Sequence, residues 1–307
     1  MTSRSGLRSL VGTTFGKPFV KPLGTALAAV ALTATAAAPV AALATPDATA
    51  LFDSSGRWAP AATAVVHPGV MTETEGSGQC TANFVYTAAT RVFLGQAAHC
   101  SSTGEATETN GCSARSLPLG TPVKIVGTDI VGHMVYNSWL AMQQRGETDP
   151  NACAYNDLAL IEFPAGTAAK MNPSVPVYGG PVGVNTTGTR NGDRVLSYGN
   201  SSLRQGAAVL SPKTGTSLGD DGNGWTHTVY TVTPGIPGDS GSAFLDGEGR
   251  ALGDLSTLGF APLPLSNQVS DLAHELTYAR AFDPTLAGLR VAAGTEPFLP
   301  GALPRAS

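Results

Sequence analysis

The sequence has 307 residues, of which 18 are basic and 22 acidic, so charged residues make up 13% of the chain against roughly 25% in an ordinary soluble domain. Its 37 glycines and 22 prolines favour short elements and turns, and exclude a coiled coil or a helical bundle. Hydrophobic residues make up 42% of the chain, which is enough for a sizeable core and excludes a disordered chain.

Residues 1–44 have the three parts of a secretory signal peptide. Four basic residues precede an apolar stretch, and Ala42, Leu43 and Ala44 offer the small side chains that a signal peptidase accepts. We predict cleavage after Ala44, secretion without stable membrane insertion, and a short N-terminal segment over residues 45–60. An uncleaved membrane anchor is the alternative, although the stretch is weakly hydrophobic for a span. Removing residues 1–44 moves the net charge of −4 four units further negative, which disfavours nucleic acid as a partner.

From about residue 61 to residue 258, short β-branched or aromatic runs alternate with turn residues. This spacing, without helical patterns between the runs, predicts an all-β fold with antiparallel strands closed into barrels or sandwiches. The runs are Thr81–Tyr86, Val123–Val126, Ile130–Tyr136, Leu158–Phe163, Val195–Tyr198, Thr226–Thr233 and Ala243–Leu245. A Gly- and Pro-rich stretch over residues 164–188 is a possible link between two halves.

One amphipathic helix is predicted near the C-terminus. Val269, Leu272 and Leu276 fall at helical spacing, and Ser266 or Asn267 is a possible cap, so the helix is expected over about residues 266–280. Residues 281–307 are rich in Gly, Pro and Ala and are predicted to form an irregular tail.

The four cysteines all lie in the part of the chain predicted to be exported. They are Cys80, Cys100, Cys112 and Cys153. An even number in an oxidising compartment favours two disulfides, and three pairings are open at this point. Zinc is disfavoured because neither C-x-x-C nor H-x-x-x-H spacing occurs. We expect no metal and no cofactor.

Three motifs carry candidate chemistry. His99 follows two alanines and precedes Cys100, Asp157 opens the apolar run Leu158–Phe163, and Ser240 lies in Gly238-Asp239-Ser240-Gly241. In the order His, Asp, Ser, the three motifs together resemble the chymotrypsin-like serine peptidases, in their secreted bacterial form. The resemblance covers about residues 61–280, and its specificity comes from the agreement of three independent motifs.

The resemblance implies a serine endopeptidase with two antiparallel Greek-key β-barrels and a C-terminal helix. Barrel one is expected over about residues 61–165 and barrel two over about 175–260 of a peptidase domain spanning 61–280. Ser240 would be the nucleophile, His99 the base and Asp157 the group that orients His99, with the backbone amides of Gly238 and Ser240 as the oxyanion hole.

The family's cysteine arrangement implies that Cys80 pairs with Cys100, which leaves Cys112 for Cys153. A bridge between Cys80 and Cys100 would close a loop of about 20 residues. In the chain-entropy model this closure would contribute roughly 3 kcal/mol of stability, and the bridge would fix the backbone of His99.

Two departures from the family pattern concern specificity and activation. Pro234 stands where trypsin-type members have an acidic residue, and Ser256, Thr257 and Leu258 resemble the Ser-Trp-Gly segment of the primary pocket. These residues imply a small or apolar side chain at the cleaved position. The Ile-Val-Gly-Gly type of N-terminus that activates zymogens does not occur between Ala44 and His67, so the partner of Asp239 is open.

Other features have ordinary interpretations. His67, His133, His227 and His274 lie outside the three motifs and are expected to be surface or strand residues. The segment Asp220–Gly224 is expected to form a hairpin turn rather than a calcium loop, because the remaining ligand spacing is missing. We expect a monomer that acts on protein or peptide substrates. A catalytically silent binding module and an esterase that uses the same triad are the alternative functions.

Overall fold

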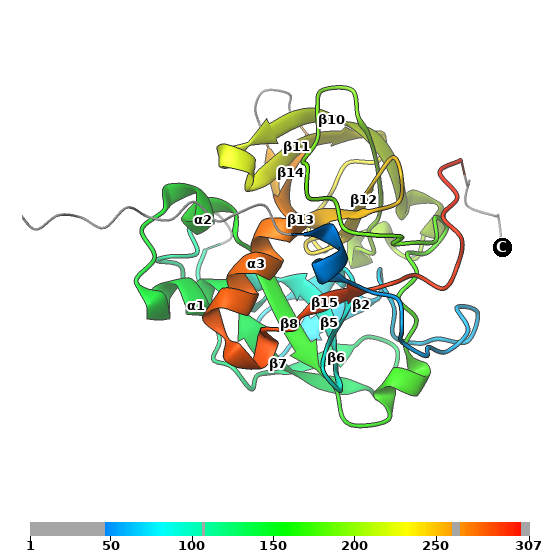
Figure 1. The fold of residues 1–307 in the computed structure, drawn as a ribbon, viewed down its shortest axis with the longest axis horizontal. Coiled ribbons are helices and arrows are strands. Elements are labelled where there is room, and N and C mark those ends of the chain that lie inside the picture. The colour runs from blue at the N-terminus through cyan, green and yellow to red at the C-terminus, as the bar shows by residue number, and fades with distance from the viewer. Residues whose placement is uncertain (1–46, 106–107, 260–264, 302–307) are drawn as a thin grey trace, which may run out of the picture. The chain divides into compact units, whose positions relative to one another are not determined.

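The computed structural model describes residues 47–105, 108–259 and 265–301, and only the backbone of residues 258 and 259. The predicted signal peptide lies outside the described residues. Within this part of the chain, no helix is both long enough and apolar enough to cross a membrane. The all-β prediction is confirmed, because the described residues form one large sheet and one closed barrel (Figure 1).

The first sheet has nine strands in the order β1-β15-β4-β5-β8-β7-β6-β2-β3. Its strands are β1 (Phe52–Asp53), β2 (Met71–Thr74), β3 (Gln79–Thr81), β4 (Val85–Ala88), β5 (Arg91–Ala97), β6 (Pro122–Ile125), β7 (Val131–Asn137), β8 (Leu158–Glu162) and β15 (Arg290–Ala292). Strand β3 contacts β5, and beyond β3 the Asn83 amide donates to the Gly95 carbonyl of β5 at 2.8 Å. The six strands from β5 to β3 therefore curl back on themselves as a barrel does.

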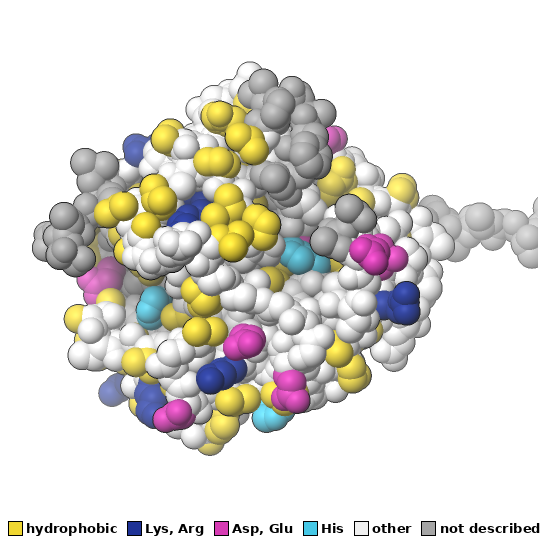
Figure 2. Space-filling view, turned by 180° about the vertical axis from the view of Figure 1, so that it is seen from behind, with side chains coloured by type: hydrophobic (Ala, Val, Ile, Leu, Met, Phe, Trp, Pro, Cys, Tyr) yellow, Lys and Arg dark blue, Asp and Glu magenta, His cyan; other side chains and the backbone are white. Residues whose placement is uncertain are grey.

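The second half forms a closed barrel in the order β10-β11-β14-β13-β12-β9. Its strands are β9 (Arg194–Tyr198), β10 (Pro212–Asp221), β11 (Thr226–Thr231), β12 (Ala243–Asp246), β13 (Ala251–Gly259) and β14 (Ser266–Asp271). Six buried apolar residues from these strands form a separate cluster, among them Val195, Phe244 and Leu255. Figure 2 shows hydrophobic side chains gathered over this half on one face, where charged side chains are scattered.

The helices are short and lie outside the sheets. They are α1 (Ser138–Arg145), α2 (Pro150–Tyr155), α3 (Leu272–Phe282) and the 3-10 turns η1 (Ala48–Leu51), η2 (Ala98–Ser101), η3 (Thr167–Lys170), η4 (Ser202–Arg204), η5 (Ala208–Leu210), η6 (Gly222–Gly224) and η7 (Pro284–Leu286). Helices α1 and α2 were not predicted. Asn137 caps α1 by accepting the amides of Trp139 and Leu140, and Gly146 ends it with φ of 68°.

The predicted helix over residues 266–280 is wrong in its first part. Ser266–Asp271 is strand β14, which pairs with β11 on one side and β13 on the other. This pairing satisfies the backbone and buries Val269 inside the barrel, so tertiary contacts override the helical spacing. Helix α3 starts only at Leu272, where the Asp271 side chain caps it by accepting the His274 amide at 2.8 Å.

The segments at both ends of the described chain are also more ordered than predicted. Phe52–Asp53, within the predicted N-terminal segment, pairs in parallel with Arg290–Ala292. Those last residues, predicted to be an irregular tail, pair on their other side with β4 in antiparallel register. Val291 and Ala292 are buried in the two apolar clusters of this half whereas Arg290 is exposed, so pairing and burial together hold this segment as a strand.

Candidate active site

His99 lies in η2, directly after the long strand β5. The next residue, Cys100, is bonded to Cys80 of β3, which ties the histidine turn to a neighbouring strand. The other two cysteines, Cys112 and Cys153, also form a disulfide, and Cys153 lies in α2. These are the two pairings that the family resemblance implies. Both bridges hold segments that lead directly to residues of the candidate site.

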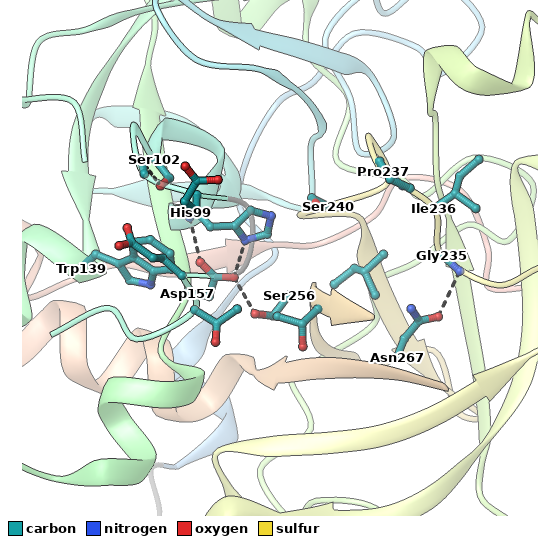
Figure 3. Close-up of a pocket in the computed structure, with 16 residues that line it drawn as sticks. His99, Ser102, Trp139, Asp157, Gly235, Ile236, Pro237, Ser240, Ser256 and Asn267 are labelled. Carbon is teal, nitrogen blue, oxygen red and sulfur yellow. Dashed lines mark hydrogen bonds and ion pairs between the residues drawn. The ribbon is translucent and has the colours of Figure 1, made fainter. Parts of the chain in front are cut away.

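Asp157 follows α2, opens strand β8 and faces His99 in a buried position. Its Oδ2 lies 2.7 Å from His99 Nδ1 and accepts the Ser256 hydroxyl at 2.6 Å, and its Oδ1 accepts the His99 amide at 2.9 Å. Because a carboxylate only accepts hydrogen bonds, the shared proton lies on Nδ1. The other ring nitrogen, Nε2, is then an unprotonated base, and Figure 3 shows this side of the ring facing Ser240.

The protonation of His99 is biased by its charged neighbours. Burial disfavours the imidazolium, but the Asp157 carboxylate and its hydrogen bond, with a smaller contribution from Asp254, outweigh burial and raise the pKa of His99 above 6.5. A base with a raised pKa holds an abstracted proton more firmly. The arrangement therefore stabilises the imidazolium that forms when a serine is deprotonated.

Ser240 lies in a turn that only glycine allows at two positions. Gly238 has φ of 94° and Gly241 has φ of 82°. A Cβ on Gly241 would lie 2.7 Å from the backbone nitrogen of Ala97, and one on Gly238 would lie 2.5 Å from Gln79 Oε1. The serine is therefore presented by a backbone shape that a larger residue would distort.

The peptide groups around Gly238 have fixed orientations. The Pro237 carbonyl accepts the Ser201 hydroxyl at 2.6 Å, and the Gly238 carbonyl accepts the Thr81 hydroxyl at 2.7 Å. In a trans peptide the N–H points opposite to the carbonyl, so the Gly238 N–H points away from Ser201. Among described partners, neither this N–H nor that of Ser240 donates a hydrogen bond. Both donors are thus available to an anionic oxygen at the site.

Asp239, the residue before Ser240, has two buried cations as partners. Both of its carboxylate oxygens accept the Arg204 guanidinium, and Lys213 Nζ lies 2.9 Å from Oδ2. Lys213 is completely buried and also donates to the carbonyls of Thr233 and Pro234. Burial lowers the pKa of Lys213, and the Asp239 charge opposes that shift. The partner of Asp239 is therefore internal to the fold.

His99, Asp157 and Ser240 border one pocket of about 620 Å³, the size of a typical small-ligand site, whereas Gly238 is not part of its lining. It is lined by His99, Ser102, Gly104, Glu105, Glu108, Thr109, Trp139, Asp157, Gly235, Ile236, Pro237, Ser240, Leu255, Ser256, Thr257 and Asn267. Of the four residues predicted to bind substrate, Ser256 and Thr257 are in this lining. Pro234 is not, since it contributes its carbonyl to Lys213 instead. The side chain of Leu258 lies outside the described residues.

Asn267 is a pocket residue that the sequence patterns did not reveal. It lies in β14 at one end of the pocket, and its Oδ1 accepts the Gly235 amide at 3.0 Å (Figure 3). This bond fixes the side-chain amide so that Nδ2 is left as the donor. The sequence analysis treated Asn267 as a possible cap of the helix predicted over residues 266–280. In the structure it lies on strand β14, where its neighbours are those of the pocket.

The residues near His99 do not fit a metal ion. Cys80, His99 and Cys100 offer ligand atoms within 4.8 Å of one another. Both sulfurs are consumed in the disulfide, however, and a disulfide provides no thiolate. No other such group of His, Cys, Asp and Glu ligands occurs in the described part of the chain.

Comparisons with known proteins give structural similarity without sequence similarity. No family model matches the chain, and no curated protein matches it. Protease A of Thermobifida fusca is 15% identical, with a TM-score of 0.46 over 75% of this chain and 100% of its own. The Nocardiopsis protease NAPase is 17% identical, with a TM-score of 0.44 over 74% and 98%. Cellulomonas bogoriensis chymotrypsin is 17% identical, with a TM-score of 0.41 over 74% and 97%. In structure, the chain is similar to these three proteases.

Proposed function

We propose that the protein is a secreted serine endopeptidase that cleaves peptide bonds through an acyl-enzyme on Ser240. One observation carries the proposal. The Asp157–His99 pair borders the same pocket as Ser240, and the free N–H groups of Gly238 and Ser240 flank that serine. A base, an orienting acid, a nucleophile and two oxyanion donors are the parts that acyl transfer requires.

In this mechanism, the Ser240 oxygen attacks the carbonyl carbon while His99 Nε2 takes the hydroxyl proton. The N–H groups of Gly238 and Ser240 stabilise the tetrahedral oxyanion, and each such donor is typically worth about 3 to 4 kcal/mol. The C–N bond then breaks, and the imidazolium returns the proton to the leaving amine. Water attacks the acyl-enzyme with His99 again as the base, which releases the acid and restores Ser240.

For the cleaved position, we propose a preference for small or medium apolar side chains. Ile236 and Leu255 contribute apolar surface to the pocket, and its described lining contains no basic or acidic group on the Asn267 side. Profiling with a peptide library tests this preference. Predominant cleavage after Gln or Glu would contradict it, since that result would mean that the Asn267 amide dominates recognition.

Maturation is proposed to consist of signal removal alone. Arg204 and Lys213 already neutralise Asp239, so the site has no need of a newly liberated N-terminal amine. N-terminal sequencing of the exported protein is expected to begin at Thr45. A start well beyond Pro60 would instead indicate an additional processing step.

The proposed activity is tested by labelling the exported protein with a serine-directed fluorophosphonate at neutral pH. The parent is expected to label, Ser240→Ala to lose labelling and His99→Ala to label far more slowly. Ser242→Ala is the matched control. The buried Ser242 hydroxyl has no hydrogen-bond partner among the described residues, so its removal is expected to leave fold and labelling unchanged.

Two outcomes would redirect the proposal. A folded, disulfide-bonded parent that stays unlabelled would contradict an active serine and favour the silent binding module. Labelling that depends on Ser240, combined with turnover of esters but not of peptides, would favour the esterase.

A further inference from the structure

Three buried carboxyl groups gather behind His99, and only Asp157 belongs to the proposed triad. Asp254 of β13 and Glu275 of α3 are both completely buried. No Lys or Arg in the described part of the chain forms an ion pair with either one. Ionised carboxylates without a cation are rare in protein interiors because their desolvation is very costly. This pair therefore requires a chemical explanation.

Glu275 contacts the triad directly through the backbone. Its Oε1 accepts the Asp157 N–H at 2.9 Å. On the other side of the same residue, the Asp157 carbonyl accepts the Ala98 N–H. Together these bonds fix the backbone from which the Asp157 carboxylate reaches His99. Glu275 thus supports the orientation of the aspartate from a helix more than a hundred residues later in the chain.

Asp254 faces Glu275 on one side and Asn83 on the other. The Asn83 oxygen already accepts the Phe84 amide at 2.7 Å and the Tyr86 hydroxyl at 2.9 Å, so its NH2 group is the part left for Asp254. Neither Asp254 oxygen has a donor in ordinary hydrogen-bond geometry among the described groups. A hydrogen bond between Asp254 and Glu275 requires a proton on one of them.

Electrostatics favour retention of that proton. Burial, reinforced by the nearby Asp157 charge, raises the pKa of Asp254 well above its ordinary value. Burial and the proximity of Asp254 do the same to the pKa of Glu275. The other titratable groups that face the pair are His99, Tyr86 and Tyr136, and both tyrosines are buried with raised pKa values. Neither tyrosine therefore adds a negative charge at neutral pH.

We propose that Asp254 and Glu275 hold one proton between them in a carboxyl–carboxylate hydrogen bond, and that Glu275 is thereby held as a positioning residue for Asp157. Because Oε1 of Glu275 already receives the Asp157 N–H, Oε2, which has no other partner among the described residues, is the oxygen left for this bond. The effect on reaction rate rests on the proposed peptidase function, whereas the presence of the shared proton does not.

Infrared difference spectroscopy tests the proton without reference to activity. The folded parent at pH 7 is expected to show the carbonyl band of a protonated carboxylic acid, and Asp254→Asn and Glu275→Gln are each expected to lose it. Asp246→Asn is the matched control, because Asp246 is a buried aspartate that has an ion-pair partner, Arg250. A parent without the band, or a band that survives in both Asp254→Asn and Glu275→Gln, would overturn the assignment.

Kinetics test the positioning role. The side-chain amide that Asp254→Asn introduces can still donate to Glu275, so this variant should retain kcat within about threefold. Asp254→Leu, which has similar volume and no donor, should lower kcat at least about tenfold with little change in KM. Equal kcat values in the two folded variants would refute the role. If the infrared band is present and the parent takes up no fluorophosphonate, the proton assignment holds and the peptidase proposal fails.

Discussion

Buried carboxyl groups near Ser240 and behind His99 have different partners. Beside Ser240, Asp239 is matched by the guanidinium of Arg204 and the ammonium of Lys213. Behind His99, Asp254 and Glu275 are buried together, and no Lys or Arg in the described part of the chain pairs with either one. The Arg204 guanidinium stays charged over the whole physiological pH range, whereas a proton shared by two carboxyl groups can be lost to solvent. The comparison indicates that the charge balance at Asp239 does not depend on pH, whereas the proposed proton of the Asp254–Glu275 pair behind His99 does.

The largest expected effect comes from removing the cation at the serine end. Arg204→Ala leaves a buried Asp239 with only Lys213, and breaking a buried ion pair on one side costs about 3–5 kcal/mol of unfolding free energy. Denaturant unfolding measures the loss. Arg190→Ala, which truncates an exposed arginine, is the control and should stay within about 0.5 kcal/mol of the parent. A loss below about 1 kcal/mol for Arg204→Ala would mean that Lys213 alone satisfies Asp239.

His227 is a buried cation whose charge depends on pH. It therefore contrasts with Arg204, whose charge does not. It is completely buried between Asp220 and Asp271, at 2.7 and 3.0 Å. Burial opposes its protonation, but hydrogen bonds and charges from the two carboxylates outweigh burial and raise its pKa to about 9. The resulting stabilisation, about 3 kcal/mol, is fully present below pH 6.5 and disappears as pH rises through 9.

Urea unfolding of His227→Gln measures this dependence. The parent should be more stable than the variant by about 3 kcal/mol at pH 6, and the gap should shrink steadily toward pH 10. His133→Gln, at an exposed position in β7, is the control and should show no such trend. A gap that is constant with pH would contradict an imidazolium at position 227.

The smallest effect is expected for Lys213→Met. Methionine fills similar space without charge, and Arg204 still contacts both oxygens of Asp239. The loss should be about 2 kcal/mol by denaturant unfolding, because Lys213 gives up its charged hydrogen bond to Asp239 together with those to the half-buried carbonyls of Thr233 and Pro234. If the loss equals that of Arg204→Ala, the two cations share Asp239 equally and the expected ranking of the two is wrong.

Sequence patterns predicted those strands whose own residues have high strand propensity. Runs such as Leu158–Phe163 and Val195–Tyr198 are apolar and β-branched, and they form β8 and β9 almost as expected. Strand β10 was missed because Pro212–Asp221 contains proline, two glycines and three charges, which is typical of a loop. Its strand conformation comes from pairing with β9 and β11, and no local pattern contains that information.

The candidate site likewise contains residues that local motifs predicted and residues that they did not. The motifs around His99, Asp157 and Ser240 are local, so the sequence identified the residues that the fold brings to one pocket. Arg204, Lys213, Asp254 and Glu275 were missed, because charged residues are almost always on the surface and nothing local marks these four as buried. Their importance depends on contacts between segments that only the folded chain brings together.

The position of β15 has a consequence for the timing of folding. Arg290–Ala292 lies between β1 and β4, so the sheet next to His99 is completed by a segment that follows the His99, Asp157 and Ser240 motifs in the chain. During synthesis, the edge of β4 and the side chains around Val291 lack their final neighbour. A nascent chain that ends before Ala292 would therefore not present an intact first sheet.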